Sequence, residues 1–133
     1  MTALDMYASD RDACARPTVL VVEDEILIRM MVSESLRQAG CEVFEAASAD
    51  EALEVLSASA SPDVLVTDVK MPGCVDGLEL ASRVRKTLPE LKVVITSGHA
   101  LAQSADGVAD AFLAKPFALE QLVGRVRALV AAE

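Results

Sequence analysis

Short apolar runs alternate with amphipathic stretches along most of this chain. Runs rich in β-branched residues predict buried strands, and apolar positions repeated every three or four residues predict helices. We expect strands at 18–22, 41–46, 63–68, 91–96 and 111–114, with 41–46 at a sheet edge. We expect helices at 26–39, 48–56, 76–88 and 119–132. Strands that alternate with helices in this way predict one doubly wound, five-stranded parallel sheet.

Several local signals support these boundaries. Ser48 followed by Glu51 forms a capping-box pattern, Gly40 ends the first helix, and Pro89 closes the third. The acidic residues before the first helix suit its dipole. The stretch 100–108 has a weak pattern and predicts a short helix or none.

Composition and charge narrow the class of protein. The chain has 133 residues, enough for one domain, and its formal net charge of −9 argues against nucleic-acid binding. No apolar run approaches the roughly 18 residues of a membrane span, so we expect a cytoplasmic protein. Three scattered cysteines, at 14, 41 and 74, lack the spacing of a zinc or redox site. We expect a flexible tail at 1–16 and a single domain at 17–133.

Chemically useful residues lie where four of the predicted strands end. They are Glu23 and Asp24, Asp68, Thr96 and Ser97, and Lys115 with Pro116. Ligands of open parallel sheets bind just outside the carboxyl ends of the strands. The pattern therefore predicts a binding site at this edge, with Asp68 at its centre.

These motifs resemble those of a known family. Val-Val-Glu-Asp-Glu at 21–25, Val-Thr-Asp-Val-Lys-Met-Pro at 66–72 with Asp-Gly at 76–77, Thr-Ser-Gly at 96–98 and Lys-Pro-Phe at 115–117 resemble the receiver domain of bacterial two-component response regulators. The resemblance covers the chain from about Thr18 to its end. It implies a flavodoxin-like fold with strand order 2-1-3-4-5.

The resemblance also implies residue roles. Asp68 matches the phosphoacceptor, Asp24 the direct ligand of Mg²⁺ or Mn²⁺, Glu23 an acid that acts through water, and Lys70 the residue whose backbone carbonyl binds the metal. Lys115 matches the lysine that binds the phosphoryl group. Ser97 matches the switch hydroxyl, with Thr96 as the substitute, and Phe112 matches the switch aromatic. The bond between Lys115 and Pro116 is a candidate cis peptide.

Elementary chemistry agrees with these roles. A carboxylate that accepts a phosphoryl group acts as a nucleophile and forms an acyl phosphate. Three neighbouring carboxylates repel one another, and a divalent cation relieves that repulsion while bridging to phosphate oxygens. Mg²⁺ suits the site because it uses few carboxylates and keeps several waters. Lys115 adds a compact positive charge.

Each residue also has an ordinary structural interpretation. The acids at 23–25 are a favourable helix start, Asp68 a turn former, Ser97 a cap, Lys115 a solvated charge and Phe112 a core residue. His99 is interpreted as an exposed loop residue that tunes phosphoryl lifetime. The joint pattern outweighs these interpretations for Asp24, Asp68 and Lys115, and weakens them for Ser97 and Phe112.

Two departures from the family pattern bear on function. The loop at 71–77 is one residue longer than the common version. The stretch between Ser97 and Phe112 is shorter by about one helical turn, so we expect a short or irregular fourth helix and an altered output and dimer surface.

The sequence thus predicts a stand-alone response regulator, since no output domain follows Glu133. A histidine kinase or histidine phosphotransfer protein would phosphorylate Asp68, and the chain, a monomer or weak dimer, would act through an unknown protein partner or as a phosphate sink or shuttle. It would lose phosphate slowly without being an enzyme. Two alternatives stay open: a phosphorylation-independent interaction module, and a Mg²⁺-dependent phosphohydrolase. A phosphohydrolase with an aspartate nucleophile would be expected to carry a second acid at the position of Lys70.

Overall fold

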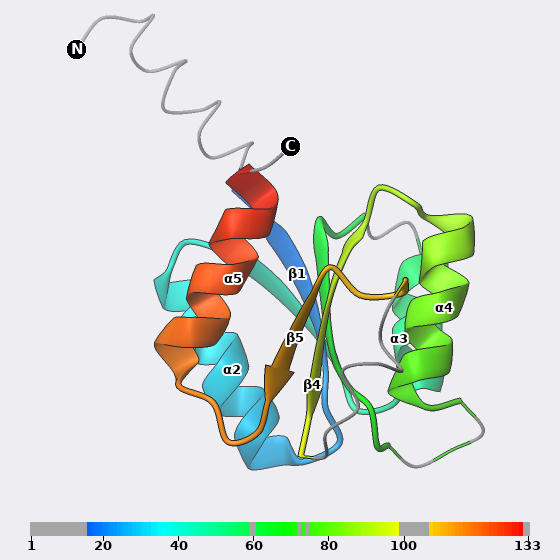
Figure 1. The fold of residues 1–133 in the computed structure, drawn as a ribbon, viewed down its shortest axis with the longest axis horizontal. Coiled ribbons are helices and arrows are strands. Elements are labelled where there is room, and N and C mark those ends of the chain that lie inside the picture. The colour runs from blue at the N-terminus through cyan, green and yellow to red at the C-terminus, as the bar shows by residue number, and fades with distance from the viewer. Residues whose placement is uncertain (1–15, 59–60, 72, 74, 99–106, 132–133) are drawn as a thin grey trace, which may run out of the picture.

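Five parallel strands form the single sheet of this protein. The computed structural model describes residues 16–58, 61–71, 73, 75–98 and 107–131. The strands are β1 (Thr18–Val22), β2 (Glu42–Ala46), β3 (Val64–Asp68), β4 (Lys92–Ser97) and β5 (Ala111–Ala114). Their order is β2-β1-β3-β4-β5, which confirms the predicted topology and places β2 at an edge (Figure 1).

Helices cover both faces of the sheet. They are α2 (Ile26–Gln38), α3 (Ala49–Ser57), α4 (Gly77–Thr87) and α5 (Leu119–Ala131). Helices α2 and α5 pack on one face, and α3 and α4 pack on the other (Figure 1). Within the described residues, no helix is long and apolar enough to cross a membrane.

Side chains alternate between the two faces of the sheet along each strand, so the protein has one hydrophobic core on each face. Leu20, Leu65 and Ile95 face the cluster under α3 and α4. Val66 and Val94 face the cluster under α2 and α5. The central strand β3 is buried at all five positions, which explains why its sequence reads as a continuous apolar run that ends in an acid.

Most predicted boundaries are confirmed, with small differences. Ser48 caps α3 by accepting a hydrogen bond from the Glu51 backbone N–H at 3.1 Å, but the Glu51 carboxylate reaches the N–H of Ala47. Gly40 follows α2 with a φ of 96°, as a left-handed residue past a helix end requires. No acid lies in the first turn of α2, so the predicted dipole effect is confined to the residues before it.

Strand β4 ends one residue later than predicted, so Ser97 belongs to the sheet. Its backbone carbonyl accepts a hydrogen bond from the Lys115 N–H at 2.7 Å, which extends the pairing of β4 with β5. Two predictions fall mainly outside the described residues. These are the tail at 1–16, of which only residue 16 is described, and the short fourth helix near 100–108, of which only 107 and 108 are described.

An ion pair braces the amino end of β5 against α4. The Arg85 guanidinium donates to Asp110 Oδ2 at 2.7 Å, and the same carboxylate oxygen accepts the Val93 N–H at 2.8 Å. Partial burial opposes ionisation of Asp110, but the hydrogen bonds from Arg85 and Val93 outweigh it and lower the pKa of this carboxyl. The brace therefore joins α4, β4 and β5 through one charged group.

Gly77, the first residue of α4, lies directly against the backbone of the β3 end. Its N–H donates to the Val69 carbonyl at 2.9 Å. A Cβ added at Gly77 would overlap the backbone oxygen of Asp68 and crowd Val69 Cα. Only glycine permits this close approach, so the helix start and the end of β3 are held together as a unit.

We expect Arg85→Ala to lower the free energy of unfolding at neutral pH by about 1–2 kcal/mol, because it leaves the partly buried Asp110 without its charged partner. Arg83→Ala on the same helix removes only an exposed pair with Glu79 and should cost about 0.5 kcal/mol or less. Urea denaturation measures both, and equal losses would contradict the role of the brace.

The contribution of Asp110 should also depend on pH. Because its folded pKa is lowered, the stabilisation is complete above the ordinary pKa of an aspartate and is lost as pH falls through the folded value. The difference between the parent protein and Arg85→Ala should therefore shrink only in acid.

We expect Gly77→Ala to destabilise the protein by about 1–3 kcal/mol, since backbone atoms must move to admit the methyl group. Gly124→Ala, in the interior of α5, is the matched control. A Cβ there meets nothing within 4 Å, so this change should stabilise by about 0.5–1 kcal/mol. Thermal unfolding distinguishes the two, and stabilisation by Gly77→Ala would refute the close-approach argument.

Candidate functional site

Three carboxylates meet at the carboxyl edge of β1 and β3. Glu23 and Asp24 follow β1 directly, and Asp68 is the last residue of β3, the neighbouring strand. Oxygens of the three carboxylates all lie within 4.8 Å of one another. Glu23 and Asp68 are buried, with 4% and 9% of their surface exposed, whereas Asp24 is open to solvent. The predicted cluster is therefore present in the fold.

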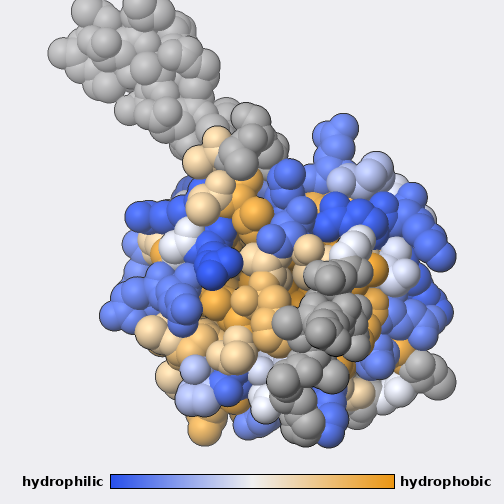
Figure 2. All heavy atoms as spheres, viewed as in Figure 1, coloured by the Kyte–Doolittle hydropathy of each residue, from blue (hydrophilic) through white to orange (hydrophobic). Residues whose placement is uncertain are grey.

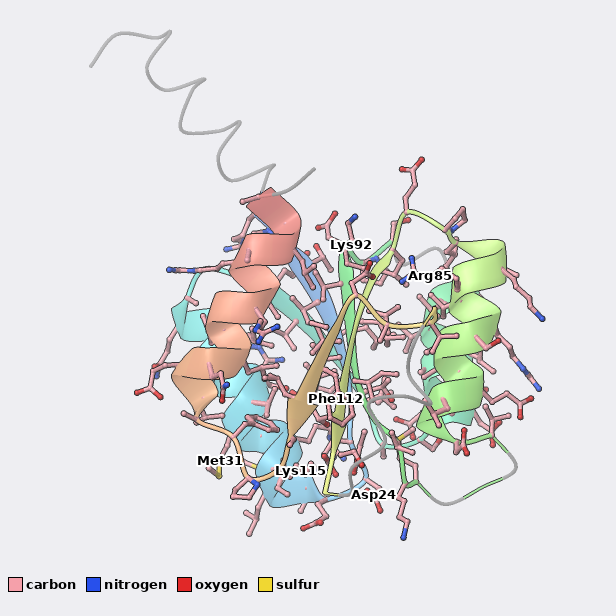
Figure 3. All side chains as sticks on the ribbon, in the orientation of Figure 1. Asp24, Met31, Arg85, Lys92, Phe112 and Lys115 are labelled. Atoms are coloured by element: carbon pink, nitrogen blue, oxygen red, sulfur yellow. The ribbon has the colours of Figure 1, made fainter. Side chains whose placement is uncertain are left out.

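Lys115 bridges two of these acids from the end of β5. Its Nζ donates to Glu23 Oε1 and to Asp68 Oδ2, both at 3.0 Å. Figure 3 shows Lys115 and Asp24 at the same lower edge of the molecule. The peptide bond between Lys115 and Pro116 is cis, as predicted. Residues more than 90 positions apart in sequence thus converge on one site.

The electrostatics of the cluster follow from this bridge. Burial opposes the charge of Lys115, but its hydrogen bonds to Glu23 and Asp68 prevail and raise its pKa. Burial raises the pKa of Glu23, and the hydrogen bond from Lys115 offsets this only in part. The lysine therefore stays charged at neutral pH and supplies a positive charge beside the three acids.

The Asp68 carboxylate is held at both oxygens. Oδ1 accepts the Val69 N–H at 2.8 Å, and Oδ2 accepts from Lys115. The Thr67 hydroxyl donates to the Asp68 backbone carbonyl at 2.9 Å. These contacts fix the orientation of a carboxylate at the open end of a buried strand.

The sheet register places the two candidate hydroxyls differently. Thr96 lies opposite Asp68, and Ser97 lies opposite Ala114; both hydroxyl residues are buried. Alternation along β4 puts Ser97 on the α3 and α4 side of the sheet. Phe112 is half-buried and packs against the cluster on that same side. The switch roles of Ser97, Thr96 and Phe112 stay predictions, as does the metal-binding carbonyl of the exposed Lys70.

The donor set fits a hard divalent cation. All three groups offer carboxylate oxygens, the ligands that Mg²⁺ and Mn²⁺ prefer, and the exposed Asp24 leaves room for coordinated water. The clustering of like charges gives a physical reason for binding such an ion. Asp24, Asp68 and Glu23 are the residues that would hold it.

An apolar surface beside the acids was not predicted. Ile26, Leu27, Met30 and Met31 on the first turns of α2 expose 55–71% of their surface. Apolar side chains are visible at the lower left of Figure 2, over this end of the helix. The sequence signal existed, since these apolar residues fall on more sides of the helix than one buried stripe requires.

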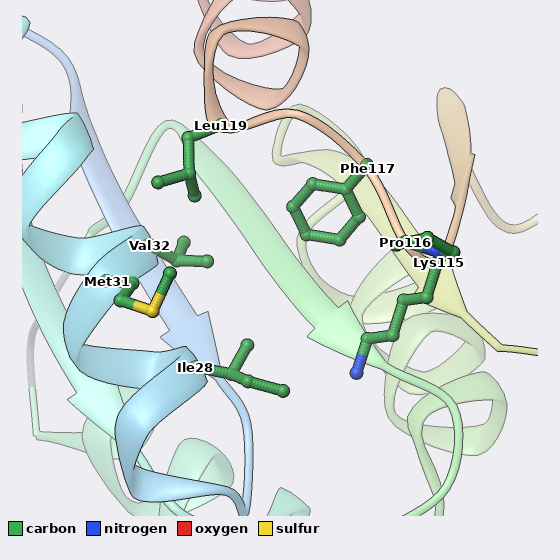
Figure 4. Close-up of a pocket in the computed structure, with 7 residues that line it drawn as sticks. All are labelled: Ile28, Met31, Val32, Lys115, Pro116, Phe117 and Leu119. Carbon is green, nitrogen blue, oxygen red and sulfur yellow. The ribbon is translucent and has the colours of Figure 1, made fainter.

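A pocket of about 350 Å³ adjoins this surface. It lies between α2 and the turn into α5, and Lys115 forms part of its wall (Figure 4). Its lining is mostly apolar and consists of Ile28, Met31, Val32, Lys115, Pro116, Phe117 and Leu119. The charged site and the pocket therefore share the side chain of Lys115.

Sequence reasoning also missed Arg29. Its guanidinium donates to the backbone carbonyl of Glu23 at 2.8 Å and pairs with Glu45 on β2. Nothing in the linear pattern singles it out, because its partners lie on a loop and on a neighbouring strand.

Known proteins share this arrangement. The family model of the response regulator receiver domain matches residues 19–127. Over 116 residues the chain is 41% identical to the response regulator MprA of Mycobacterium ulcerans, covering 84% of this chain and 49% of that protein. It is also 41% identical over 124 residues to the sensor kinase CckA of Brucella abortus, covering 90% of this chain and 13% of that protein.

Solved structures agree. The receiver domain of the Francisella response regulator 1452 superposes with a TM-score of 0.81 at 28% identity, covering 88% of this chain and 98% of that one. The Thermotoga maritima response regulator TrrA, solved in complex with Mg²⁺-BeF, superposes with a TM-score of 0.77 at 31% identity, covering 85% of this chain and 98% of that one.

The chain spans about half of MprA and a small part of CckA, so the similarity concerns one domain of those proteins. The strand order, the acid cluster with its lysine and the match over residues 19–127 all point the same way. This chain belongs to the response regulator receiver domain family.

Proposed function

We propose that this chain accepts a phosphoryl group on Asp68 from the phosphohistidine of a histidine kinase or a histidine phosphotransfer protein. Receiver domains interact with such proteins and generally act as signalling modules without enzymatic turnover. The observation that carries the proposal is the position of Lys115, whose Nζ lies 3.0 Å from a carboxylate oxygen of both Asp68 and Glu23. We place the protein in the cytoplasm, the usual compartment of the family.

The chemistry is a nucleophilic displacement at phosphorus. A carboxylate oxygen of Asp68 forms the new P–O bond while the P–N bond to the donor imidazole breaks, and the imidazole nitrogen keeps the electron pair. Lys115 remains protonated and neutralises charge on a phosphoryl oxygen, and the hydroxyl of Ser97, or of Thr96 in its place, donates to another. Positioning and charge neutralisation are the main contributions of these residues.

Receiver domains bind Mg²⁺ at an acidic pocket. Here Asp24 and Asp68 would hold Mg²⁺ or Mn²⁺ directly, Lys70 through its backbone carbonyl, and Glu23 through water. When bound, the ion neutralises negative charge between the acids and the incoming phosphoryl group. The Mg²⁺-BeF complex of TrrA, a protein of the same fold, supports this assignment.

Phosphorylation would bias a two-state equilibrium of the strand-end loops, with Ser97 and Phe112 as the responding residues. The resulting state would contact a downstream protein, or the chain would pass on or lose its phosphoryl group as a shuttle or sink. The acyl phosphate would hydrolyse slowly without a separate enzyme. Both outcomes use the same acceptor.

The apolar surface at the start of α2 is the place where we expect the phosphodonor to dock. The donor histidine must approach Asp68 from the open edge of the sheet. Exposed apolar residues lie on the first turns of α2, which begins two residues past Asp24: Ile26, Leu27, Met30 and Met31. The pocket beside Lys115 continues the same apolar surface toward α5. A helix of the donor, with its own apolar stripe, fits a surface of this kind.

Intact mass spectrometry tests the acceptor. After incubation with acetyl phosphate and Mg²⁺, the parent chain should gain the mass of one phosphoryl group, and chelation of the metal should prevent it. Asp68→Asn should abolish the gain. Asp63→Asn is the matched control, because Asp63 precedes the same strand at its opposite end, where it accepts the Thr18 N–H.

No added mass on the parent chain would sink the acceptor assignment and favour a phosphorylation-independent interaction module. Release of many equivalents of inorganic phosphate per chain would favour a phosphohydrolase.

Paired substitutions test the docking surface. Leu27→Gln with Met31→Gln should slow phosphotransfer from a histidine phosphotransfer protein about tenfold or more, a loss equal to about 1.4 kcal/mol of interaction energy. Labelling by acetyl phosphate should stay unchanged, since the small donor needs no docking surface. Leu88→Gln, which alters an exposed apolar residue after α4, is the control.

The donor used is the one that labels the parent chain fastest in a panel of purified phosphotransfer proteins. Equal loss with both kinds of phosphodonor would show that the substitutions damage the site itself, and no loss with the protein donor would refute docking on α2.

A further inference from the structure

Arg29 connects the acidic loop to the edge strand of the sheet. Its Nη1 donates to the backbone carbonyl of Glu23 at 2.8 Å, and its Nε lies 3.3 Å from Glu45 Oε1. The Arg29 side chain is 16% exposed and that of Glu45 is 30% exposed, so both contacts are partly sheltered from water. A charged donor on a backbone carbonyl is among the stronger hydrogen bonds in proteins.

Glu45 is itself held in place. It lies on β2 opposite Val21, and its second carboxylate oxygen accepts from Arg37 at 3.1 Å. The Glu23 N–H donates to the Ala46 carbonyl on the same strand at 3.0 Å. Glu23 is therefore fixed through its N–H by the backbone of β2, and through its carbonyl by Arg29, which β2 anchors.

The direction of the Glu23 carbonyl matters because that carbonyl belongs to the peptide unit leading into Asp24. Holding it fixes ψ of Glu23 and φ of Asp24, the two dihedral angles that set how the acids are oriented to each other. Both acids belong to the carboxylate cluster at the end of β1. A free carbonyl would let this peptide unit turn and separate their oxygens.

We propose that Arg29 is a positioning residue for the divalent-metal site, acting through the Glu23–Asp24 peptide unit and held in place by Glu45. The inference rests on the proposed function, which puts the metal at these acids. Arginine suits the task because its planar guanidinium spans two acceptors with separate nitrogens. A lysine ammonium in its place retains the charge but does not reproduce the fixed fork.

The sign of the effect separates positioning from simple electrostatics. A positive charge near the site repels a metal cation, so its removal should tighten metal binding if charge alone matters. If Arg29 instead orients the acids, its removal should weaken binding. Arg29→Lys isolates the geometric part, because it keeps the charge and loses the two-point contact.

The test is isothermal titration calorimetry of the full chain with Mg²⁺ and with Mn²⁺. We expect Arg29→Lys and Arg29→Gln to raise the dissociation constant roughly tenfold, the usual scale for residues that orient metal ligands. Glu45→Gln should give a smaller rise, since the guanidinium keeps its contact with the Glu23 carbonyl. Arg83→Gln is the matched control and should bind metal like the parent, because Arg83 is an exposed guanidinium on α4 that pairs with Glu79.

Two further readouts separate positioning from general damage. Urea unfolding without metal should show that Arg29→Lys is folded at the temperature of the titration; if it is not, Glu45→Gln carries the test. The rate of labelling by acetyl phosphate should need more Mg²⁺ in Arg29→Lys yet reach the parent's plateau, as expected when metal affinity alone is weakened.

Parent-like affinity in Arg29→Lys, or tighter binding in Arg29→Gln, would overturn the positioning role while leaving the proposed function intact. Absence of metal binding by the parent chain would overturn the proposed metal site and this inference with it.

Discussion

Mutual repulsion among Glu23, Asp24 and Asp68 is the constraint on which the rest of this structure depends. A parallel sheet brings the ends of its strands to one edge, so acids on β1 and β3 must lie close together whether or not they attract a ligand. Lys115, which follows β5, compensates part of that negative charge. On the other side, the Arg29 guanidinium donates a hydrogen bond to the Glu23 backbone carbonyl. The fold thus supplies positive charge to this edge both from the β2 side and from the β5 side.

The fold was largely predictable because its signals are local. Apolar runs ending in acids indicated β1 and β3, while Gly40 and the Ser48 cap marked helix boundaries that the structure confirms within one or two residues. The end of β4 was misplaced by one residue, because pairing with β5 through the Ser97 carbonyl decides it and no local signal does. Gly77 was recognised only as part of a motif, whereas the structure gives the steric reason for a glycine there.

The residues of the site likewise differ in how far local sequence signals indicate them. Asp68, Asp24 and Lys115 could be found because each lies at or just past the end of a strand, and strand ends share an edge. The choice between Thr96 and Ser97 depends on the register between β3 and β4, which alternation alone leaves open. Arg29 could not be found from sequence, since a guanidinium on a helix becomes informative only when a loop carbonyl and Glu45 on another strand are known to lie beside it. The exposure of Leu27 likewise requires knowing which side of α2 meets the sheet.

Lys115 joins two environments that are usually separate. Its ammonium sits between carboxylates, while its side chain also forms part of the wall of the apolar pocket beside α2. Any side chain that fills this pocket displaces water from around Lys115 and lowers the local dielectric constant, which strengthens the attraction between the ammonium and the acids. A partner that filled the pocket would thereby change the electric field at Asp68, the acceptor that we propose, without any movement of the backbone.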